Sequence, residues 1–213
     1  MKALHGVEAE LKYGLTRQEY DILYKAHCKM ALSQERHINF YFDDKHLNLR
    51  RVHIGLRIRQ INTRKMVLTL KYPKSGVRSE IRAFKVRSEF EAPLSVKCAQ
   101  KIISGEKDIL SLKCYPIRKL FRVYPIHTLC EVVPLGSIRT HRLKASLNHK
   151  FTMELDKSQM FGKTFYELEV ETNRPKKADR AIHNLFWKYG ITYQPVRRSK
   201  LARFIEEWRK RQK

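Results

Sequence analysis

Long apolar runs are missing from this chain of 213 residues. No stretch approaches the roughly 20 consecutive apolar residues that a membrane-spanning helix needs. The first six residues also contain no apolar segment of the kind that signal peptides carry. We therefore expect neither a membrane span nor a cleaved signal peptide.

Cysteine is scarce, and glycine-rich phosphate loops are absent. The four cysteines lie too far apart to form a zinc or thioredoxin motif, which favours reduced, half-buried thiols and a cytoplasmic location. The nine histidines are scattered and are expected to be surface or packing residues. Because neither a Walker nor a Rossmann loop is present, parallel nucleotide-binding folds are disfavoured.

Acidic residues are few compared with basic ones. The chain has 21 Asp and Glu against 45 Lys and Arg, which gives a formal net charge of +24. A hydrophobic content of 42% with 10% aromatic residues is that of a globular protein and argues against wholesale disorder. The positive charge predicts a polyanionic partner such as nucleic acid, polyphosphate, a nucleotide or a membrane surface.

Period-two patterns typical of strands recur along the chain, without any internal repeat. Many such strands at hairpin spacing, with helices between and after them, predict an α+β fold built on a large antiparallel sheet or barrel. The predicted strands cover residues 7–12, 37–42, 55–61, 66–72, 77–91, 129–133, 137–146, 150–155 and 164–172.

Helix signals separate these strands. Thr16 and Glu19 form a capping box that should open a helix through about residue 32. A second helix is expected over 94–104, and a short one over 109–121, interrupted at Pro116. Further helices are expected over 175–189, capped by Gly190, and over about 199–209.

Two tryptophans fall within the last two predicted helices. Trp187 and Trp208, together with Leu185, Phe186 and Phe204, are expected to be core or helix-packing residues. They are not expected to be platforms on which bases stack.

Charged residues gather at alternate positions of the predicted strands, so each group shares one face of the sheet, with about 7 Å between neighbours. Adjacent carboxylates repel one another and are best compensated by cations. Hard ions such as Mg²⁺ or Mn²⁺ accept such oxygen ligands, usually beside substrate phosphates. For any single group, ordinary pairing of Glu with Arg across a solvated sheet remains the alternative. The groups are Glu8 and Glu10; Arg57 and Arg59; Lys85 and Arg87; Glu89 and Glu91; and Glu167, Glu169 and Glu171.

If the strands close into a barrel with these faces inward, the interior becomes a charged tunnel. Its basic wall would hold several phosphates, and its acidic wall would hold a metal ion. That combination suits a triphosphate, whose oxygens need neutralisation while one phosphoryl group is attacked. A water-filled tunnel would keep the charges solvated.

The order of the motifs resembles the CYTH family, also called triphosphate tunnel metalloenzymes. Residues 7–12 resemble the family's N-terminal Glu-x-Glu-x-Lys signature, residues 155–171 its metal-binding hairpin, and residues 198–200 its C-terminal Ser-Lys element. The resemblance implies a single domain over 1–213, consisting of an eight-stranded antiparallel β-barrel flanked by helices. Segments 41–43, 49–51, 55–59, 68–71, 87–91 and 136–142 resemble further family strands.

The resemblance also implies roles for the basic residues. Lys200 and Lys12 are the candidate catalytic residues. A lowered pKa of Lys200, if it is desolvated beside arginines, would allow it to act as a base. Arg139 competes with Arg142 for one phosphate-binding position. The implied substrate-binding residues are Arg57, Arg59, Lys71, Arg87, Arg142 and Lys200.

Acidic residues are the implied ligands of Mg²⁺ or Mn²⁺. Glu167 has the same facing as its neighbours but a less secure match to the family. Asp44 stands where the family often has Thr, at a turn expected to lie outside the metal site. The implied metal ligands are Glu8, Glu10, Glu89, Glu91, Asp156, Glu169 and Glu171.

The function that follows is metal-dependent hydrolysis of a triphosphate, with inorganic tripolyphosphate as the first choice of substrate. Thiamine triphosphatase and class IV adenylyl cyclase are alternatives within the family. A non-catalytic module that binds polyphosphate or nucleic acid is an alternative of another class. Because acids and bases nearly balance in the expected tunnel, the excess positive charge should lie on the outer surface, where it could contact nucleic acid or polyphosphate.

Overall fold

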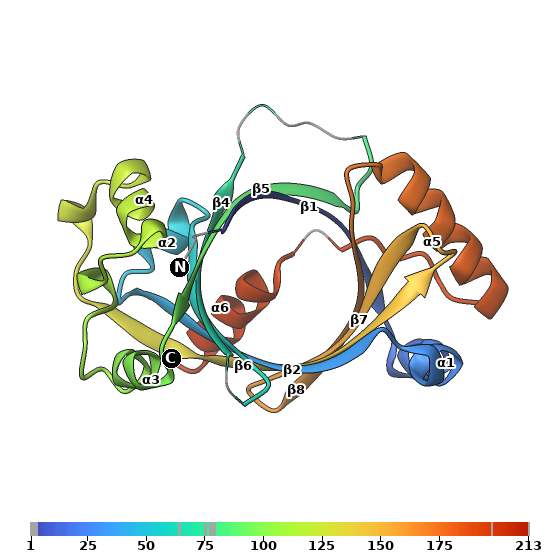
Figure 1. Ribbon diagram of the computed structural model, residues 1–213, viewed down its shortest axis with the longest axis horizontal. Coiled ribbons are helices and arrows are strands. Elements are labelled where there is room, and N and C mark those ends of the chain that lie inside the picture. Colours follow the sequence, from blue (N-terminus) through green and yellow to red (C-terminus); the bar gives the residue numbers. More distant parts are fainter. Residues whose placement is uncertain (1–3, 64, 75, 77–79, 197, 213) are drawn as a thin grey trace. The chain divides into compact units, whose positions relative to one another are not determined.

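The computed structural model describes residues 4–63, 65–74, 76, 80–196 and 198–212. Its eight strands close into a β-barrel in the order β1-β5-β4-β3-β2-β6-β7-β8 (Figure 1), with antiparallel pairing. The predicted fold class is therefore confirmed. The strands are β1 (Leu4–Leu15), β2 (Ser33–Asp44), β3 (Gly55–Ile61), β4 (Lys65–Pro73), β5 (Phe84–Leu94), β6 (Val132–Leu147), β7 (Phe151–Met160) and β8 (Lys163–Glu171).

Helices connect and follow the strands in the described part of the chain. None of the described helices is long and apolar enough to cross a membrane. Short 3-10 turns cover Cys28–Met30, Ile109–Ser111 and Ile126–Thr128. The helices are α1 (Arg17–His27), α2 (Asn48–Arg51), α3 (Val96–Ile103), α4 (Tyr115–Val123), α5 (Pro175–Tyr189) and α6 (Lys200–Lys210).

The chain divides into two compact units, and each contributes strands to the barrel. Unit 1 consists of Met1–Val7, His37–Ser75 and Arg87–Ile138. Unit 2 consists of Glu8–Arg36, Gly76–Val86 and Arg139–Lys213. The prediction of a single domain over the whole chain stays a prediction.

Each unit has its own hydrophobic core on one face of its strands. In unit 2, Leu11 of β1, Leu155 of β7 and Leu168 of β8 share a buried cluster with Ile182 and Phe186 of α5. Since a strand alternates its side chains between two faces, the residues between these apolar positions lie on the opposite face. The helices cover the apolar face, so in a closed barrel the other face points inward.

Unit 1 follows the same rule. Leu56 of β3, Leu68 of β4 and Phe90 of β5 are buried with Ile102 of α3 and Leu120 of α4. The charged residues at the alternate positions of these strands again lie on the inner face. The period-two interpretation of both units is therefore confirmed.

Several predicted boundaries are wrong for local physical reasons. The capping box of Thr16 and Glu19 is present, but α1 ends at His27 and a 3-10 turn replaces its last turn. Pro116 lies in the first turn of α4, where its missing N–H has no helical partner to lose, so it starts the helix and does not interrupt it.

Three strand predictions also need correction. The run predicted over 77–91 becomes a strand only at Phe84, and residues 77–79 lie outside the described part of the chain. The separate predictions over 129–133 and 137–146 are replaced by the continuous strand β6, which begins at Val132. The strand predicted to end at residue 155 continues to Met160, so Asp156 lies inside β7.

The expected burial of the tryptophans is only partly right. Leu185, Phe186 and Phe204 are buried as predicted, and Trp208 is half-buried. Trp187 is 88% exposed, so its prediction as a core residue is wrong. It falls on the solvent side of α5, because Leu185 and Phe186 already occupy the side that packs on the sheet.

The four cysteines are free thiols. Cys28, Cys98 and Cys114 are half-buried, as expected, whereas Cys130 is exposed.

Candidate functional site

A row of charged side chains crosses the inner face of unit 2 from β6 to β1. Lys144 opposes Glu154, Glu154 opposes Glu169, and Glu169 opposes Lys12. Directly opposed side chains on one face lie about 5 Å apart, so two acids stand side by side between two lysines. The Nζ of Lys12 lies 2.7 Å from Glu169 and 3.5 Å from Glu10.

Arg142 connects this row to the next one. It opposes Asp156, and its Nε and Nη2 donate to the two carboxylate oxygens at 2.7 and 2.6 Å. Nη2 also donates to Glu169 at 2.9 Å, while Nη1 pairs with Glu154. Arg139, the competing candidate, is exposed on the other face of β6. Arg142 is thus the arginine that the strand register brings among the acids.

Glu167 occupies a special place because its cross-strand neighbour on β1 is a glycine. It opposes Gly14, which offers no side chain, and a Cβ on Gly14 would come within 3.1 Å of Val196. The carboxylate is fully buried, with Lys200 at 3.2 Å and Arg203 at 3.0 Å. Neither contact has hydrogen-bond geometry, so both oxygens of Glu167 lack a hydrogen-bond partner.

The first residue of α6 supplies a cation to the same acids. Ser199 caps the helix by accepting a backbone N–H, and the buried Phe204 anchors its second turn. The Nζ of Lys200 then lies 2.6 Å from Asp156 and 2.7 Å from Glu169. We call the whole group the β7–β8 charge cluster: Lys12, Arg142, Glu154, Asp156, Glu167, Glu169, Lys200 and Arg203.

Burial and ion pairing compete for the pKa values in this cluster. Burial by itself would lower the pKa of Lys12 and of Lys200, but the surrounding carboxylates outweigh it and raise both. Burial would likewise raise the pKa of Asp156 and of Glu169, yet the neighbouring cations lower both. The condition for a basic Lys200, a lowered pKa, is therefore not met, because carboxylates and not arginines are its nearest partners.

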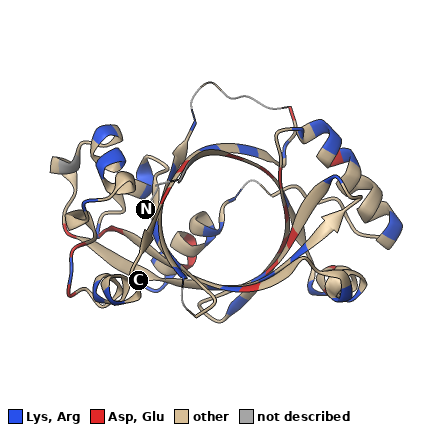
Figure 2. Ribbon diagram, viewed as in Figure 1, with Lys and Arg blue, Asp and Glu red and all other residues tan. Residues whose placement is uncertain are grey.

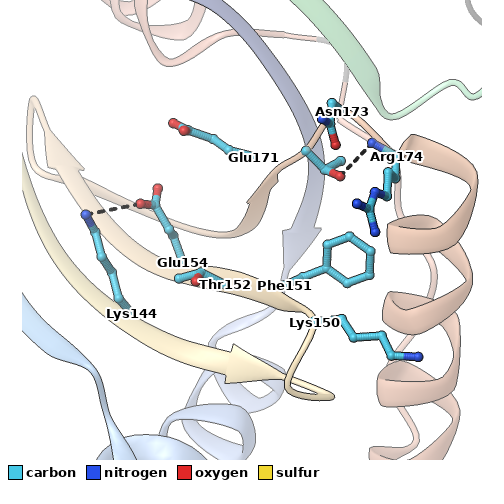
Figure 3. Close-up of a pocket in the computed structure, with 9 residues that line it drawn as sticks. Lys144, Lys150, Phe151, Thr152, Glu154, Glu171, Asn173 and Arg174 are labelled. Carbon is cyan, nitrogen blue, oxygen red and sulfur yellow. Dashed lines mark hydrogen bonds and ion pairs between the residues drawn. The ribbon is translucent and has the colours of Figure 1, made fainter.

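A pocket lies next to the cluster and shares one of its residues. Figure 3 shows Glu154 and Glu171 on the wall of this pocket. The Nζ of Lys144 lies 3.5 Å from the carboxylate of Glu154. The pocket has a volume of about 590 Å³, and Phe151 and Arg174 also line it. Its lining is largely polar and carries both signs of charge.

Two further predicted metal ligands lie in β1. Glu8 and Glu10 are half-buried and alternate along the strand, and Glu10 opposes Glu171 of β8. Strand pairing thus brings acids of β1 and β8 together on one face of unit 2.

Unit 1 carries a smaller cluster on its inner face. Glu89 of β5 forms an ion pair with Lys71 of β4 at 3.1 Å and another with Arg57 of β3 at 3.5 Å. Glu91 accepts a hydrogen bond from Thr69 at 3.0 Å, since the two residues are opposed across the strands. The strand register explains why these residues meet although they are far apart in sequence.

Arg59 and Arg87 complete the predicted set in unit 1. Arg59 Nε donates to the side-chain oxygen of the buried Asn39 at 2.9 Å. Arg87 lies half-buried in β5, two residues before Glu89 and on the same face. We call Arg57, Arg59, Lys71, Arg87, Glu89 and Glu91 the β3–β5 charge cluster.

The donor set in unit 2 suits a hard divalent ion. All the acidic atoms are carboxylate oxygens, the ligand type that Mg²⁺ and Mn²⁺ prefer. Both carboxylate oxygens of Glu167 lack a hydrogen-bond partner, so their lone pairs are available to coordinate such an ion. Within the described residues, no three acidic, histidine or cysteine side chains already stand in the arrangement of a metal centre. Lysines and arginines lie between the carboxylates, and an ion has to compete with them.

Comparison with known proteins bears on this arrangement. The family model described as "CYTH domain" matches residues 6–205. The chain belongs to the CYTH domain family.

Individual relatives agree with that membership. The Bacillus subtilis protein named "Putative triphosphatase YjbK" is 28% identical over 206 residues, which cover 96% of this chain and 97% of that protein. A structure titled "Putative adenylyl cyclase HpAC1 from Hippeastrum reveals a dominant triphophatase activity" is 25% identical, with a TM-score of 0.83, and covers 94% of this chain and 96% of that one. A "putative adenylate cyclase" from Bacillus halodurans is similar in fold, at 19% identity and a TM-score of 0.75 over 94% of this chain and 98% of that one.

Two residues of the β7–β8 charge cluster of this CYTH protein were not identified from the sequence. Glu154 precedes Asp156 by two positions, so period-two spacing alone would have placed both on one face. Arg203 follows Lys200 by three positions, a spacing that places two helical residues on neighbouring positions of one face. Both signals were present, and the predicted end of the strand at residue 155 hid the first.

Asp44, the departure from the family pattern, has a structural task. It is buried, and its carboxylate accepts backbone N–H groups from His46, Asn48 and Cys130. Asp43 beside it accepts from Leu49 and from the residue after it. The pair holds the turn around α2 in this CYTH protein.

Proposed function

We propose that this chain hydrolyses the terminal phosphoanhydride bond of a triphosphate, with inorganic tripolyphosphate as the simplest substrate. The observation that carries the proposal is the β7–β8 charge cluster, in which buried lysines and an arginine are interleaved with carboxylates. Such cations are suited to phosphate oxygens, and such carboxylates to a divalent ion. The triphosphatase activity named for the Hippeastrum and Bacillus subtilis relatives supports the same reading.

The basic residues would bind and orient the phosphates. The ammonium groups of Lys12 and Lys200 now contact carboxylates and would turn to phosphate oxygens when substrate and metal are bound. Because the neighbouring carboxylates raise their pKa values, both lysines would serve as charged hydrogen-bond donors to the phosphates. The phosphate-binding set would be Arg57, Arg59, Lys71, Arg87, Arg142 and Lys200.

The acidic residues would hold Mg²⁺ or Mn²⁺. When bound, such an ion withdraws charge from the phosphoryl oxygens and lowers the pKa of a bound water. The carboxylates also keep the lysines charged and oriented before substrate arrives. The ligand set would be Glu8, Glu10, Glu89, Glu91, Asp156, Glu169 and Glu171, with Glu167 beside them.

The reaction consumes one water molecule. Its oxygen forms a bond to the terminal phosphorus, while the bond from that phosphorus to the bridging oxygen breaks. Orthophosphate and pyrophosphate are the products, and the proton of the water is released to solvent or to a product oxygen. Cations near the bridging oxygen stabilise the negative charge that develops there.

A substrate panel tests the proposal directly. The purified chain is incubated with tripolyphosphate, thiamine triphosphate or ATP, each with Mg²⁺ or Mn²⁺, and the products are separated. Orthophosphate and pyrophosphate from tripolyphosphate are the expected result. Absence of turnover with every substrate, combined with salt-sensitive RNA binding, would instead identify a binding module.

The pocket beside the cluster favours a second candidate, a triphosphate that carries an organic group. With a volume of about 590 Å³, it has the size of a ligand-binding site. Phe151 and the amide of Asn173 offer a ring surface and hydrogen bonds to such a group. Replacing Phe151 by alanine should then weaken turnover of thiamine triphosphate or ATP and leave turnover of tripolyphosphate unchanged. Cyclic AMP among the ATP products would identify cyclase chemistry.

A further inference from the structure

The solvent side of α5 carries cations and one exposed aromatic ring. Trp187 is 88% exposed although it was expected to be buried. The exposed cations of the same helix recur at helical spacing, so they share its outward side with the ring. Figure 2 shows several basic segments along this helix. We call Lys176, Lys177, Arg180, Trp187 and Lys188 the α5 outer face.

Within the described residues of α5, no acidic side chain stands among these cations on the outward side. Asp179, the one acid in the sequence of α5, turns inward and accepts hydrogen bonds from Tyr13 and Tyr193. The helix has no acidic residue in its first turn, and Arg174 stands at its N-cap. Cations at a helix N-terminus are disfavoured by the helix dipole, so Lys176 and Lys177 gain nothing from it, whereas Lys188 lies in the last turn, where the dipole favours a cation.

The dimensions of the face suit an extended polyanion. Lys176 and Lys188 are 12 positions apart, which corresponds to about 18 Å along the helix axis at about 1.5 Å per residue. Trp187 stands near one end of this row, where its ring can stack on a base. Proteins that bind single strands without sequence preference combine a basic track with such a stacking ring.

We propose that the α5 outer face binds single-stranded nucleic acid, with the cations on phosphates and Trp187 stacked on a base. This site is separate from the proposed triphosphate chemistry, because none of its residues belongs to either charge cluster.

Two other partners fit the face less well. A helix that binds a membrane surface needs a broad apolar side to insert, whereas Trp187 is the one large apolar residue on this face. A protein interface likewise needs an apolar centre that becomes fully buried. A single ring among cations meets neither requirement. It does suit a nucleic-acid strand, because the ring can stack on a base while the cations contact the phosphates.

Binding is measured by fluorescence anisotropy of labelled oligo(U) and oligo(dT) with the full chain, at several salt concentrations. The test variant is the triple change Lys176→Gln, Lys177→Gln and Arg180→Gln. We expect it to weaken binding about tenfold or more and to reduce the slope of log K against log salt by about 2, since each phosphate contact on a single strand contributes about 0.7.

The matched control removes the same charge from exposed sites of unit 1, by Lys97→Gln, Lys101→Gln and Arg122→Gln. Equal weakening by both triple variants would show that net charge alone is responsible and would overturn the proposal. Stronger binding to vesicles that contain phosphatidylserine than to oligo(U) would also overturn it.

Stacking is tested separately through the fluorescence of Trp187. In a Trp208→Phe background, Trp187 is the one remaining tryptophan, and oligo(U) should quench its emission as binding saturates. Trp187→Ala should weaken binding several-fold, whereas Trp187→Phe should retain most of it. Unchanged emission at saturation would contradict the proposal. The kcat of tripolyphosphate hydrolysis should be the same in the α5 variants and the wild type, because steering by surface charge acts on encounter and not on turnover.

Discussion

At the scale of single residues, Lys200 shows how sequence position and chemical environment combine. Its place at the start of α6 was predictable, but its partners come from β7 and β8. Three carboxylates lie within 3.2 Å of its Nζ, the farthest being Glu167. These acids raise the pKa of the amine, which argues against the general-base role that a lowered pKa would have allowed.

Replacing Lys200 by glutamine should therefore remove a charge that the reaction uses. We expect kcat/KM for tripolyphosphate to fall by about 100-fold or more, because one charged donor to a reacting phosphate contributes several kcal/mol at the transition state, about 2.7–4 for comparable donors. Lys200→Arg should recover part of the loss. The control is Lys210→Gln in the same helix, whose exposed side chain pairs with Glu207. Activity of Lys200→Gln within threefold of the wild type at saturating metal would show that Lys200 is not catalytic.

Asp43 gives a pH-dependent prediction outside the proposed site. Burial raises the pKa of its carboxyl to about 6, although backbone N–H groups of the α2 turn act against that rise. Below about pH 4 the carboxyl group is protonated in both the folded and the unfolded chain, so no charge is buried and the free energy of unfolding is not lowered. Above about pH 6 it is charged in both, and the folded chain bears the burial penalty. Stability should thus fall as pH rises through this window.

The measurement is urea denaturation of the wild type and of Asp43→Asn at about pH 4 and about pH 7. The free energy of unfolding of the wild type, relative to the variant, should decrease by on the order of 2 kcal/mol between these pH values. A difference that stays constant or increases with pH would contradict the assignment.

At the scale of elements, alternation along strands is the feature that builds both clusters. Each strand of unit 2 sends apolar residues toward α1 and α5 and charged residues to the inner face. The pattern was readable from the sequence, strand by strand. Which charges oppose one another depends on register, and a shift of one residue would exchange the two faces.

The attachment of α5 to β1 depends on a buried hydrogen bond. Tyr13 of β1 is fully buried and donates to Asp179 of α5, to which Tyr193 also donates at 3.1 Å. Burial, aided by Asp179, raises the pKa of Tyr13, so the donor keeps its proton over the usual pH range.

Tyr13→Phe should lower the free energy of unfolding by about 1–2 kcal/mol, because the half-buried carboxylate of Asp179 loses a donor. The matched control is Tyr24→Phe, which removes an exposed hydroxyl that donates to Gln34 at 3.2 Å and should change stability by less than about 0.5 kcal/mol. Both values come from chemical denaturation followed by circular dichroism. Equal effects of the two changes would show that the buried bond adds nothing.

At the scale of the whole molecule, the net charge of +24 is not explained by the proposed site. The β7–β8 charge cluster pairs its cations with acids, so the excess positive charge lies elsewhere in the molecule. Figure 2 shows Lys and Arg on helices of both units. Such a field attracts anions from a distance and is weakened by salt.

Salt should therefore slow the capture of substrate more than its conversion. Between about 20 and about 200 mM NaCl, kcat/KM for tripolyphosphate should fall several-fold to about tenfold while kcat changes little, since steering acts on encounter. The triple variant Lys97→Gln, Lys101→Gln and Arg122→Gln should reduce the salt dependence. A kcat that falls in parallel with kcat/KM would indicate damage to the site and not loss of steering.

The sequence by itself determined the class of fold, the faces of the strands and most of the charged residues of both clusters. It could do so because period two and helix capping are local properties, written into neighbouring residues. The family resemblance added the closure of eight antiparallel strands into a barrel and the roles to be tested.

Only the tertiary structure decided which charges meet and which side of α5 reaches solvent. Arg142 prevailed over Arg139 because strand pairing turns it toward Asp156. Glu167 is left to Lys200 and Arg203 because Gly14 stands opposite it. Trp187 is exposed because other residues fill the packed side of its helix. Each outcome depends on contacts between distant segments, and such contacts are set by register and packing, which no local pattern specifies.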